Sequence, residues 1–120
     1  MLVLSIGFVP REQFVRINVA SFTDPDQRPN SCNVAITVFD VDGGALKATR
    51  LAVGNGQTRS VDLTLADLPH DTAPGRLQVR VMVQFGNPEE RKRCAATLEV
   101  VGSDDGKTSV SSPFVGNLKP

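Results

Sequence analysis

Residues 75–83 read GRLQVRVMV, and in this stretch every second side chain is a branched apolar one. The branched apolar positions are Leu77, Val79, Val81 and Val83, and the residues between them are Gln78, Arg80 and Met82. Successive side chains of a β-strand point to opposite faces, so this spacing produces one apolar face and one more polar face. Such alternation is typical of an antiparallel sheet with one side against a core and the other in water.

The same two-residue period recurs along the rest of the chain. Its apolar positions are Val15, Ile17, Val19, Val34, Ile36, Val38, Val61, Leu63, Leu65, Ala96, Leu98 and Val100. The pattern predicts strands over residues 2–8, 14–22, 32–41, 46–53, 58–65, 76–85 and 93–101, with a short edge strand over 107–111. The turn sequences between them are DGG (42–44), GNG (54–56), GNPEERK (86–92) and SDDG (103–106), with a loop over 23–31.

Short strands at steady spacing, separated by turn residues, predict an all-β protein. We expect a two-sheet antiparallel β-sandwich of about seven strands. The one long connection, residues 66–75, suits a crossing from one sheet to the other, with one helical turn after Ala66. The predicted core consists of Val15, Ile17, Val19, Val34, Ile36, Val38, Leu63, Leu65, Val79, Val81, Leu98 and Val100.

Length and composition set limits on the kind of protein this is. A chain of 120 residues corresponds to one domain, which we place at residues 1–112, with 113–120 as a C-terminal tail or linker. The formal net charge is +0, so no nucleic-acid partner is expected. No apolar run approaches the roughly 18 residues that span a bilayer, so membrane insertion is not expected either.

The first nine residues are apolar and uncharged. They lack the basic leader and the small-residue cleavage site of a signal peptide, so they are interpreted as a first strand. An uncharged strand at a sheet edge invites pairing with another chain. We therefore expect residues 2–9 to pack against a sheet edge or to pair with a second copy as a weak homodimer.

Five segments carry a resemblance to a known class of domains. They are VRINVASF (15–22), CNVAITVFDVDGG (32–44), LAVGNGQTRSVDL (51–63), GRLQVRVMV (75–83) and CAATLEVVGSDDGKT (94–108). With the turns at Gly56-Gln57-Thr58 and Pro74-Gly75, this order resembles bacterial extracytoplasmic immunoglobulin-like modules such as the cell-adhesion-related (CARDB-like) domains. The resemblance spans about residues 12–108. It implies an immunoglobulin-like sandwich with a spacer, adhesive or accessory role, and no catalytic residues to carry over.

The chain has two cysteines, Cys32 and Cys94, each at the start of a predicted strand and in its apolar phase. In an immunoglobulin-like topology the third and seventh strands flank the sixth and begin at the same end of the domain. Strands two places apart are separated by about 9.5 Å, whereas a disulfide needs Cα atoms within about 7 Å. We predict a disulfide, formed where the strand ends converge past residues 86–92. The alternative is two buried free thiols, and a metal or redox pair is not favoured because a ligand set is missing.

Acidic residues cluster in two turns, as Asp40 with Asp42 and Asp104 with Asp105. Carboxylates on loops can bind calcium, but these turns lack the further spaced oxygen ligands of a calcium loop. Turn geometry explains Asp and Gly at these positions, so the four residues are only weak metal candidates. No cofactor is expected.

Three other features could suggest chemistry. His70 is the only histidine and stands beside Asp71, but no nucleophile elbow accompanies it. GNGQTR (54–59) precedes a strand rather than the helix that a phosphate loop needs. RKR (91–93) follows two glutamates, and we interpret it as a solvated hairpin tip. We therefore expect that the chain is not an enzyme.

The expected function is a non-enzymatic structural, adhesion or accessory module of an exported bacterial protein, in the periplasm or outside the cell. Its partners would be an unknown protein or neighbouring domains of a longer chain. The alternative is a ligand-binding module for calcium or glycan. The sequence contains no Trp and no Tyr, which argues against a glycan ligand because sugar-binding faces commonly use these rings.

Overall fold

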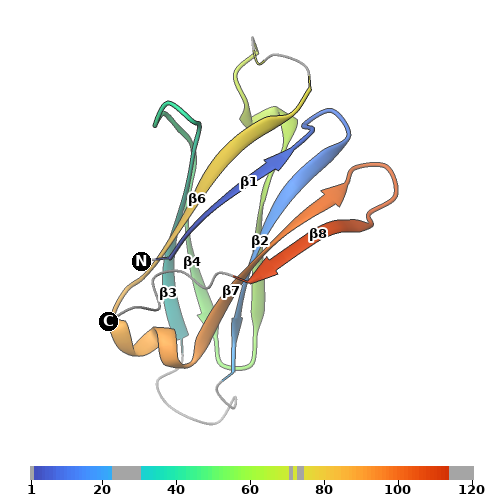
Figure 1. Cartoon of the computed structure of the whole chain (residues 1–120). Helices are drawn as coiled ribbons and strands as arrows, with labels where there is room; N and C mark the ends of the chain where they lie inside the picture. The colour runs from blue at the N-terminus through green and yellow to red at the C-terminus, as the bar shows by residue number, and fades with distance from the viewer. Residues whose placement is uncertain (1, 23–30, 71, 73–74, 114–120) are drawn as a thin grey trace.

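The computed structural model describes residues 2–22, 31–70, 72 and 75–113, and it is a two-sheet antiparallel β-sandwich (Figure 1). Sheet A has the strand order β1 (Leu2–Phe8), β6 (Leu77–Phe85), β3 (Ser31–Phe39) and β4 (Ala45–Gly54). Sheet B has the order β5 (Thr58–Leu63), β2 (Gln13–Ser21), β7 (Cys94–Gly102) and β8 (Thr108–Pro113). Two short 3₁₀ segments, η1 (Leu65–Asp67) and η2 (Pro88–Lys92), complete the described elements. The predicted fold class is confirmed, and the short edge strand of the prediction is the eighth strand, β8.

The core lies between the sheets and is built from the alternating apolar positions. Ile17, Leu63 and Leu98 of sheet B are fully buried, as are Ile36 and Val81 of sheet A. Every predicted core residue is buried except Leu65, which is half exposed. The period-2 pattern therefore identifies the inner faces of both sheets.

Leu65 was wrongly assigned to the core because β5 ends two residues before it. The carboxylate of Asp67 accepts a hydrogen bond from Thr64 N–H (2.8 Å), and Asp67 N–H donates to Thr64 O (3.0 Å). This reciprocal pair turns the chain into η1 and rotates Leu65 outward. Leu68 is buried at this end of the core instead. The helical turn expected after Ala66 corresponds to η1.

The strand order corrects the predicted neighbours of the sixth strand. The third and seventh strands do not flank the sixth, because β6 lies between β1 and β3 while β7 lies in sheet B between β2 and β8. The chain crosses between the sheets at residues 86–93, where a hairpin turn was expected. The physical reason is η2, which Asn87 caps by accepting a hydrogen bond from Glu90 N–H (3.2 Å). The crossing predicted over residues 66–75 is confirmed, since β5 is in sheet B and β6 in sheet A.

Turn geometry follows the glycines in the predicted hairpins. Gly43 in DGG has φ 90° and Gly56 in GNG has φ 73°, a conformation that glycine adopts without steric cost. Most of the predicted loop 23–31 and nearly all of the predicted tail 113–120 lie outside the described residues. Among the residues that the structure describes, no helix is long and apolar enough to cross a membrane.

Candidate functional site

A disulfide joins the two sheets at one end of the sandwich. Cys32 opens β3 in sheet A and Cys94 opens β7 in sheet B, and the two are bonded with a Cα–Cα distance of 6.7 Å. The predicted bond is confirmed, and the alternative of two free thiols is wrong. Its predicted path is also wrong, because the bond crosses between sheets rather than past the end of β6 within one sheet.

A buried carboxylate fixes η2 beside this disulfide. Glu90 is only 2% exposed, and its two oxygens accept hydrogen bonds from Asn33 N–H (2.8 Å) and Asn87 N–H (3.1 Å). The carbonyl oxygen of Glu90 lies 3.8 Å from Cys32 Sγ. η2 therefore covers the disulfide and is tied to the start of β3. In the RKR tip, Lys92 is exposed and pairs with Glu89 (3.4 Å), as expected for a solvated turn, whereas Arg93 is half-buried.

The sequence prediction missed Glu90 by treating residues 86–92 as a solvated turn. Asn87 followed three residues later by Glu90 is the signature of a capping box, with a proline at the first helical position. That spacing was the available signal for a 3₁₀ or helical turn. It would also have indicated that the Glu90 carboxylate bonds to backbone rather than to water.

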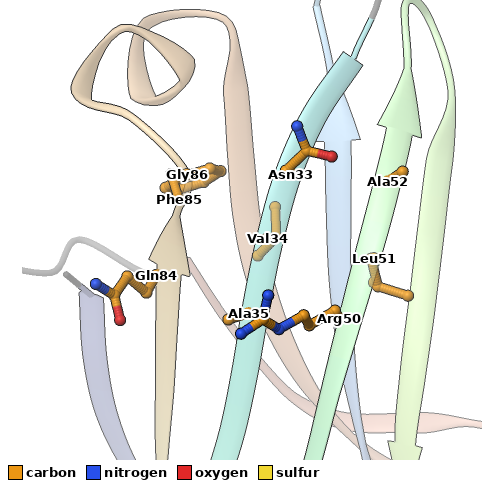
Figure 2. Close-up of a pocket in the computed structure, with 9 residues that line it drawn as sticks. All are labelled: Asn33, Val34, Ala35, Arg50, Leu51, Ala52, Gln84, Phe85 and Gly86. Carbon is orange, nitrogen blue, oxygen red and sulfur yellow. The ribbon is translucent and has the colours of Figure 1, made fainter.

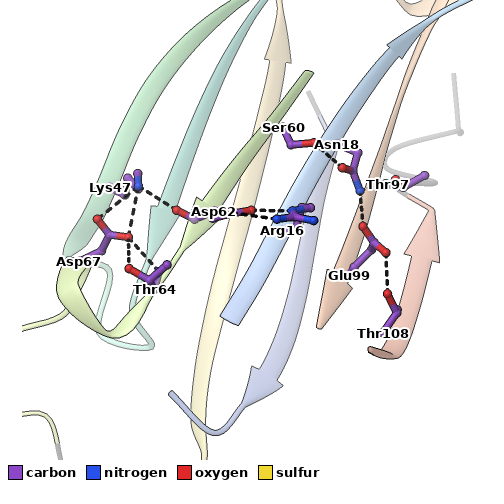
Figure 3. Close-up of polar contacts among 10 residues, drawn as sticks. All are labelled: Arg16, Asn18, Lys47, Ser60, Asp62, Thr64, Asp67, Thr97, Glu99 and Thr108. Atoms are coloured by element: carbon purple, nitrogen blue, oxygen red, sulfur yellow. Dashed lines mark hydrogen bonds and ion pairs between the residues drawn. The ribbon is translucent and has the colours of Figure 1, made fainter. Parts of the chain in front are cut away.

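The outer face of sheet B carries a ladder of paired polar side chains (Figure 3). Arg16 on β2 forms a two-pronged ion pair with Asp62 on β5, at 2.8 and 3.2 Å. Asn18 Nδ2 donates to Glu99 Oε2 on β7 (2.7 Å). Ser60 and Thr108 extend the ladder by donating to Asn18 Oδ1 (2.6 Å) and Glu99 Oε1 (2.8 Å).

The ladder changes the acidity of its members. Hydrogen bonds from Asn18 and Thr108 hold the pKa of Glu99 below its ordinary value. The hydrogen bond to Asp62 raises the pKa of Arg16. Hydrogen bonds within the ladder thus stabilise its charged side chains on three strands of sheet B.

Lys47 ties the two sheets together along the β4–β5 side (Figure 3). From β4 its ammonium donates to the carbonyl oxygen of Asp62 on β5 (2.8 Å) and to both carboxylate oxygens of Asp67 in η1 (3.2 Å each). Burial alone would raise the pKa of Asp67, but hydrogen bonds from Thr64 N–H and Lys47 outweigh it and lower the pKa. Arg59 of β5 adds a second tie by donating to Ala52 O on β4 (3.3 Å).

The outer face of sheet A has a different character. The strands of sheet A contain no acidic residue, and of their three basic residues Arg50 and Arg80 lie on this outer face, whereas Lys47, opposite the buried Val38, points towards sheet B. Lys47 is paired as described, whereas Arg50 and Arg80 are exposed and form no ion pair or hydrogen bond with any described residue. The unpaired positive charge of the sandwich strands is therefore gathered on one face.

A shallow groove of about 580 Å³ lies on this face near the disulfide end (Figure 2). The small side chains of Ala35 on β3 and Ala52 on β4 form the floor of the groove, and the longer side chains of Asn33, Arg50 and Gln84 surround it. Figure 2 shows the Arg50 side chain lying across β3 towards Ala35, its cross-strand partner. The groove combines amide and guanidinium donors with a small apolar floor. Such a surface can hydrogen-bond and ion-pair with carboxylates of a partner while its alanines permit close approach.

Two of the four weak metal candidates, Asp40 and Asp105, accept backbone hydrogen bonds within their own turns. One oxygen of Asp40 accepts hydrogen bonds from the N–H groups of Asp42 (2.9 Å) and Gly44 (2.8 Å). One oxygen of Asp105 accepts from Lys107 N–H (2.9 Å) in the β7–β8 turn. Asp42 and Asp104 are exposed in the same two turns. No group of three or more potential metal ligands occurs within the described part of the chain.

His70 is exposed in the connection between η1 and β6. Its sequence neighbour Asp71, considered with it as part of a catalytic arrangement, lies outside the described residues. The GNG segment was expected to be a hairpin, which is wrong: β4 and β5 are not paired, and this tight turn takes the chain from β4 in sheet A to β5 in sheet B. These features are therefore not brought together with the groove on sheet A.

Comparison with known proteins yields no relative for this chain: no family model, no curated protein and no solved structure matches it.

Proposed function

We propose that this chain is a non-enzymatic adhesion or accessory module of an exported protein, and that it binds a protein partner through the outer face of sheet A. The observation that carries the proposal is the difference between the two outer faces. The charged side chains on the strands of sheet B are Arg16, Arg59, Asp62 and Glu99, and each has a partner within the chain. Arg50 and Arg80 on sheet A have none among the described residues.

Exposed arginines without an internal partner are suited to binding a second protein. Arginine is enriched at protein interfaces, and its planar guanidinium binds carboxylates in two-pronged geometry. Val3 on the same face is 44% exposed, which adds apolar area at the β1 end of the sheet. The partner surface that fits is therefore acidic, with apolar side chains between its carboxylates.

The disulfide and the sequence resemblance support the exported setting of the proposal. Disulfides persist in oxidising compartments and are rare in the cytosol. We propose the immunoglobulin-like relationship in the sense of a shared two-sheet architecture, because strand order varies among domains of this kind. The order in this chain, with β7 paired to β2, is one such variation.

Site-specific photo-crosslinking in cells that produce the protein tests the proposal. A photoreactive residue at position 52 lies in the groove, and one at position 95 lies on the outer face of sheet B. We expect a protein adduct from position 52 in the extracytoplasmic fraction and little from position 95. Arg50→Glu combined with Arg80→Glu should reduce the adduct at least tenfold by reversing the charge of the face.

Both charge-reversed positions are exposed, so thermal unfolding of the double variant should match that of the parent protein and separate lost binding from lost folding. Equal adducts at positions 52 and 95, or an adduct that the charge reversal leaves unchanged, would contradict the proposed binding face.

A further inference from the structure

β1 forms one edge of sheet A and is bonded to β6 on one side only (Figure 1). Its sequence, LVLSIGF, contains no charge and no proline. No hydrogen bond joins residues 2–8 to any described residue outside β6. The unpaired backbone groups along this edge are a template for another strand.

The other three edges carry features that oppose pairing. Lys47 and Arg50 lie on β4, and Arg59 and Asp62 lie on β5, with the Lys47 and Arg59 ties running between these two edges. β8 ends at Pro113. Charges and prolines are the usual protection of an edge strand, and β1 has neither.

The side chains of β1 also fit those of a second β1. Its inward row is Leu2, Leu4, Ile6 and Phe8, of which Leu4 and Ile6 are only half-buried. In an antiparallel pair, directly opposite residues point to the same face. Because the inward residues of β1 all have even numbers, the inward faces of two copies align only when the numbers of opposite residues add to an even sum.

When the numbers of opposite residues add to 10, every residue of β1 has a partner in the second copy. This register places Ser5 opposite Ser5 of the second copy, Leu4 opposite Ile6, and Leu2 opposite Phe8. Half-exposed apolar side chains of one copy are then covered by those of the other, without any like-charge contact.

We propose that β1 is a homodimerisation edge, and that two copies join antiparallel about a two-fold axis at Ser5 into one continuous eight-stranded sheet. The dimer keeps both sheet A outer faces on the same side, so the two grooves are presented together. Pairing of one short strand buries less than the roughly 800 Å² per partner of a standard interface, so the association is weak and concentration-dependent.

Sedimentation equilibrium of the tag-free chain, from micromolar to millimolar concentration, measures the association. We expect the average mass to rise from monomer towards dimer. Ser5→Lys should abolish the rise, and Ser5→Glu should also abolish it, because each places like charges opposite each other at the axis. An equimolar mixture of the two variants should restore the dimer as a heterodimer.

A cysteine scan tests the register independently. Ser5→Cys should form an intermolecular disulfide under mild oxidation, because residues opposite each other have Cα atoms about 4.5–5.5 Å apart. Val3→Cys should not, because residue 3 then faces residue 7 of the other copy. Ala48→Lys, on the exposed face of edge strand β4, is the matched control and should dimerise like the parent.

A parent chain that stays monomeric up to millimolar concentration would overturn the proposal. So would a Ser5→Lys variant that dimerises like the parent, or a Lys and Glu mixture that fails to recover the dimer. Ser5 is exposed, so unfolding curves that match the parent show that the variants are folded.

Discussion

Ile36 is a test of how much a single core side chain contributes. It lies in the middle of β3, is 1% exposed, and faces the interior between the two sheets. We expect Ile36→Ala to lower the free energy of unfolding by about 2–5 kcal/mol, the usual cost of truncating a buried aliphatic side chain. Chemical denaturation measures the change. Gln78→Ala, at an exposed position of β6, should stay within about 0.5 kcal/mol of the parent, and a similarly small effect at Ile36 would show that it is not core.

Asp40 has a structural explanation that can be separated from metal binding. Its carboxylate accepts two backbone hydrogen bonds in the β3–β4 turn. Asp40→Ala should therefore cost about 1 kcal/mol of stability, while Asp40→Asn, which keeps an acceptor oxygen, should cost less. Thermal unfolding with and without calcium measures both effects. A rise in melting temperature with calcium that Asp40→Asn removes would instead assign the residue to a cation.

The sequence predicts the burial of single residues correctly where the two-residue hydrophobic period alone determines which side chains face the core. Val15, Ile36 and Leu98 are buried as predicted because a strand has only two faces and one is covered. Leu65 and Glu90 were misjudged because side chain-to-backbone hydrogen bonds override the period at those positions. Thr64 with Asp67, and Asn87 with Glu90, form these bonds three residues apart.

Among the elements, η1 and β4 are coupled through the Lys47–Asp67 contact. In the folded protein the pKa of Asp67 lies below its ordinary value of 3.8, so the charged form favours folding. This contribution is complete above about pH 4 and is lost as the pH falls through the lowered pKa. Asp67→Asn should cost about 1 kcal/mol at pH 7 and should weaken the loss of stability below about pH 4.

Denaturant titrations at several pH values between 2 and 7 measure that difference. Asp104→Asn is the matched control, because Asp104 is exposed in the β7–β8 turn, away from the Lys47 tie between the sheets. If both variants gave the same pH dependence as the parent, Asp67 would not be a source of acid sensitivity.

Strand positions were predictable from the sequence, but strand partners were not. Period and turn residues place β6 within a residue of its prediction, since both signals are local. Whether β7 pairs with β6 or with β2 depends on the path of residues 86–93, and η2 directs that path to sheet B. The groove on sheet A likewise needs β3, β4 and β6 as neighbours, so no single segment of sequence indicated it.

At the scale of the whole molecule, the disulfide and the Lys47 tie hold the two sheets together at different levels. The disulfide is at Cys32, where β3 begins, and the Lys47 tie is beside Val38, near the end of β3. Six residues of strand separate these levels, or about 20 Å. The core between them supplies burial, and the two ties restrict sliding of one sheet over the other at opposite ends.

The disulfide is therefore expected to make a large contribution to the stability of the whole domain. The bonded residues are 62 positions apart, and closing a loop of that length contributes about 4 kcal/mol in the chain-entropy account. Reduction, or Cys32→Ala with Cys94→Ala, should lower the melting temperature by roughly 15 °C in a domain of this size. Calorimetry with and without reductant measures the shift. A change of only one or two degrees would show that the core alone holds the sheets in register.

The same bond also reports on the compartment of the protein. If the chain is exported, its thiols in producing cells should resist a maleimide reagent after acid quenching and denaturation, and should react only once a reductant is added. Co-expressed cytosolic protein with a known free thiol controls for reagent access. Labelling of Cys32 and Cys94 before reduction would place the chain in a reducing compartment. The export part of the proposed function would then lose its physical support, while the binding face on sheet A and the β1 edge, neither of which includes a cysteine, could still be tested on the reduced protein.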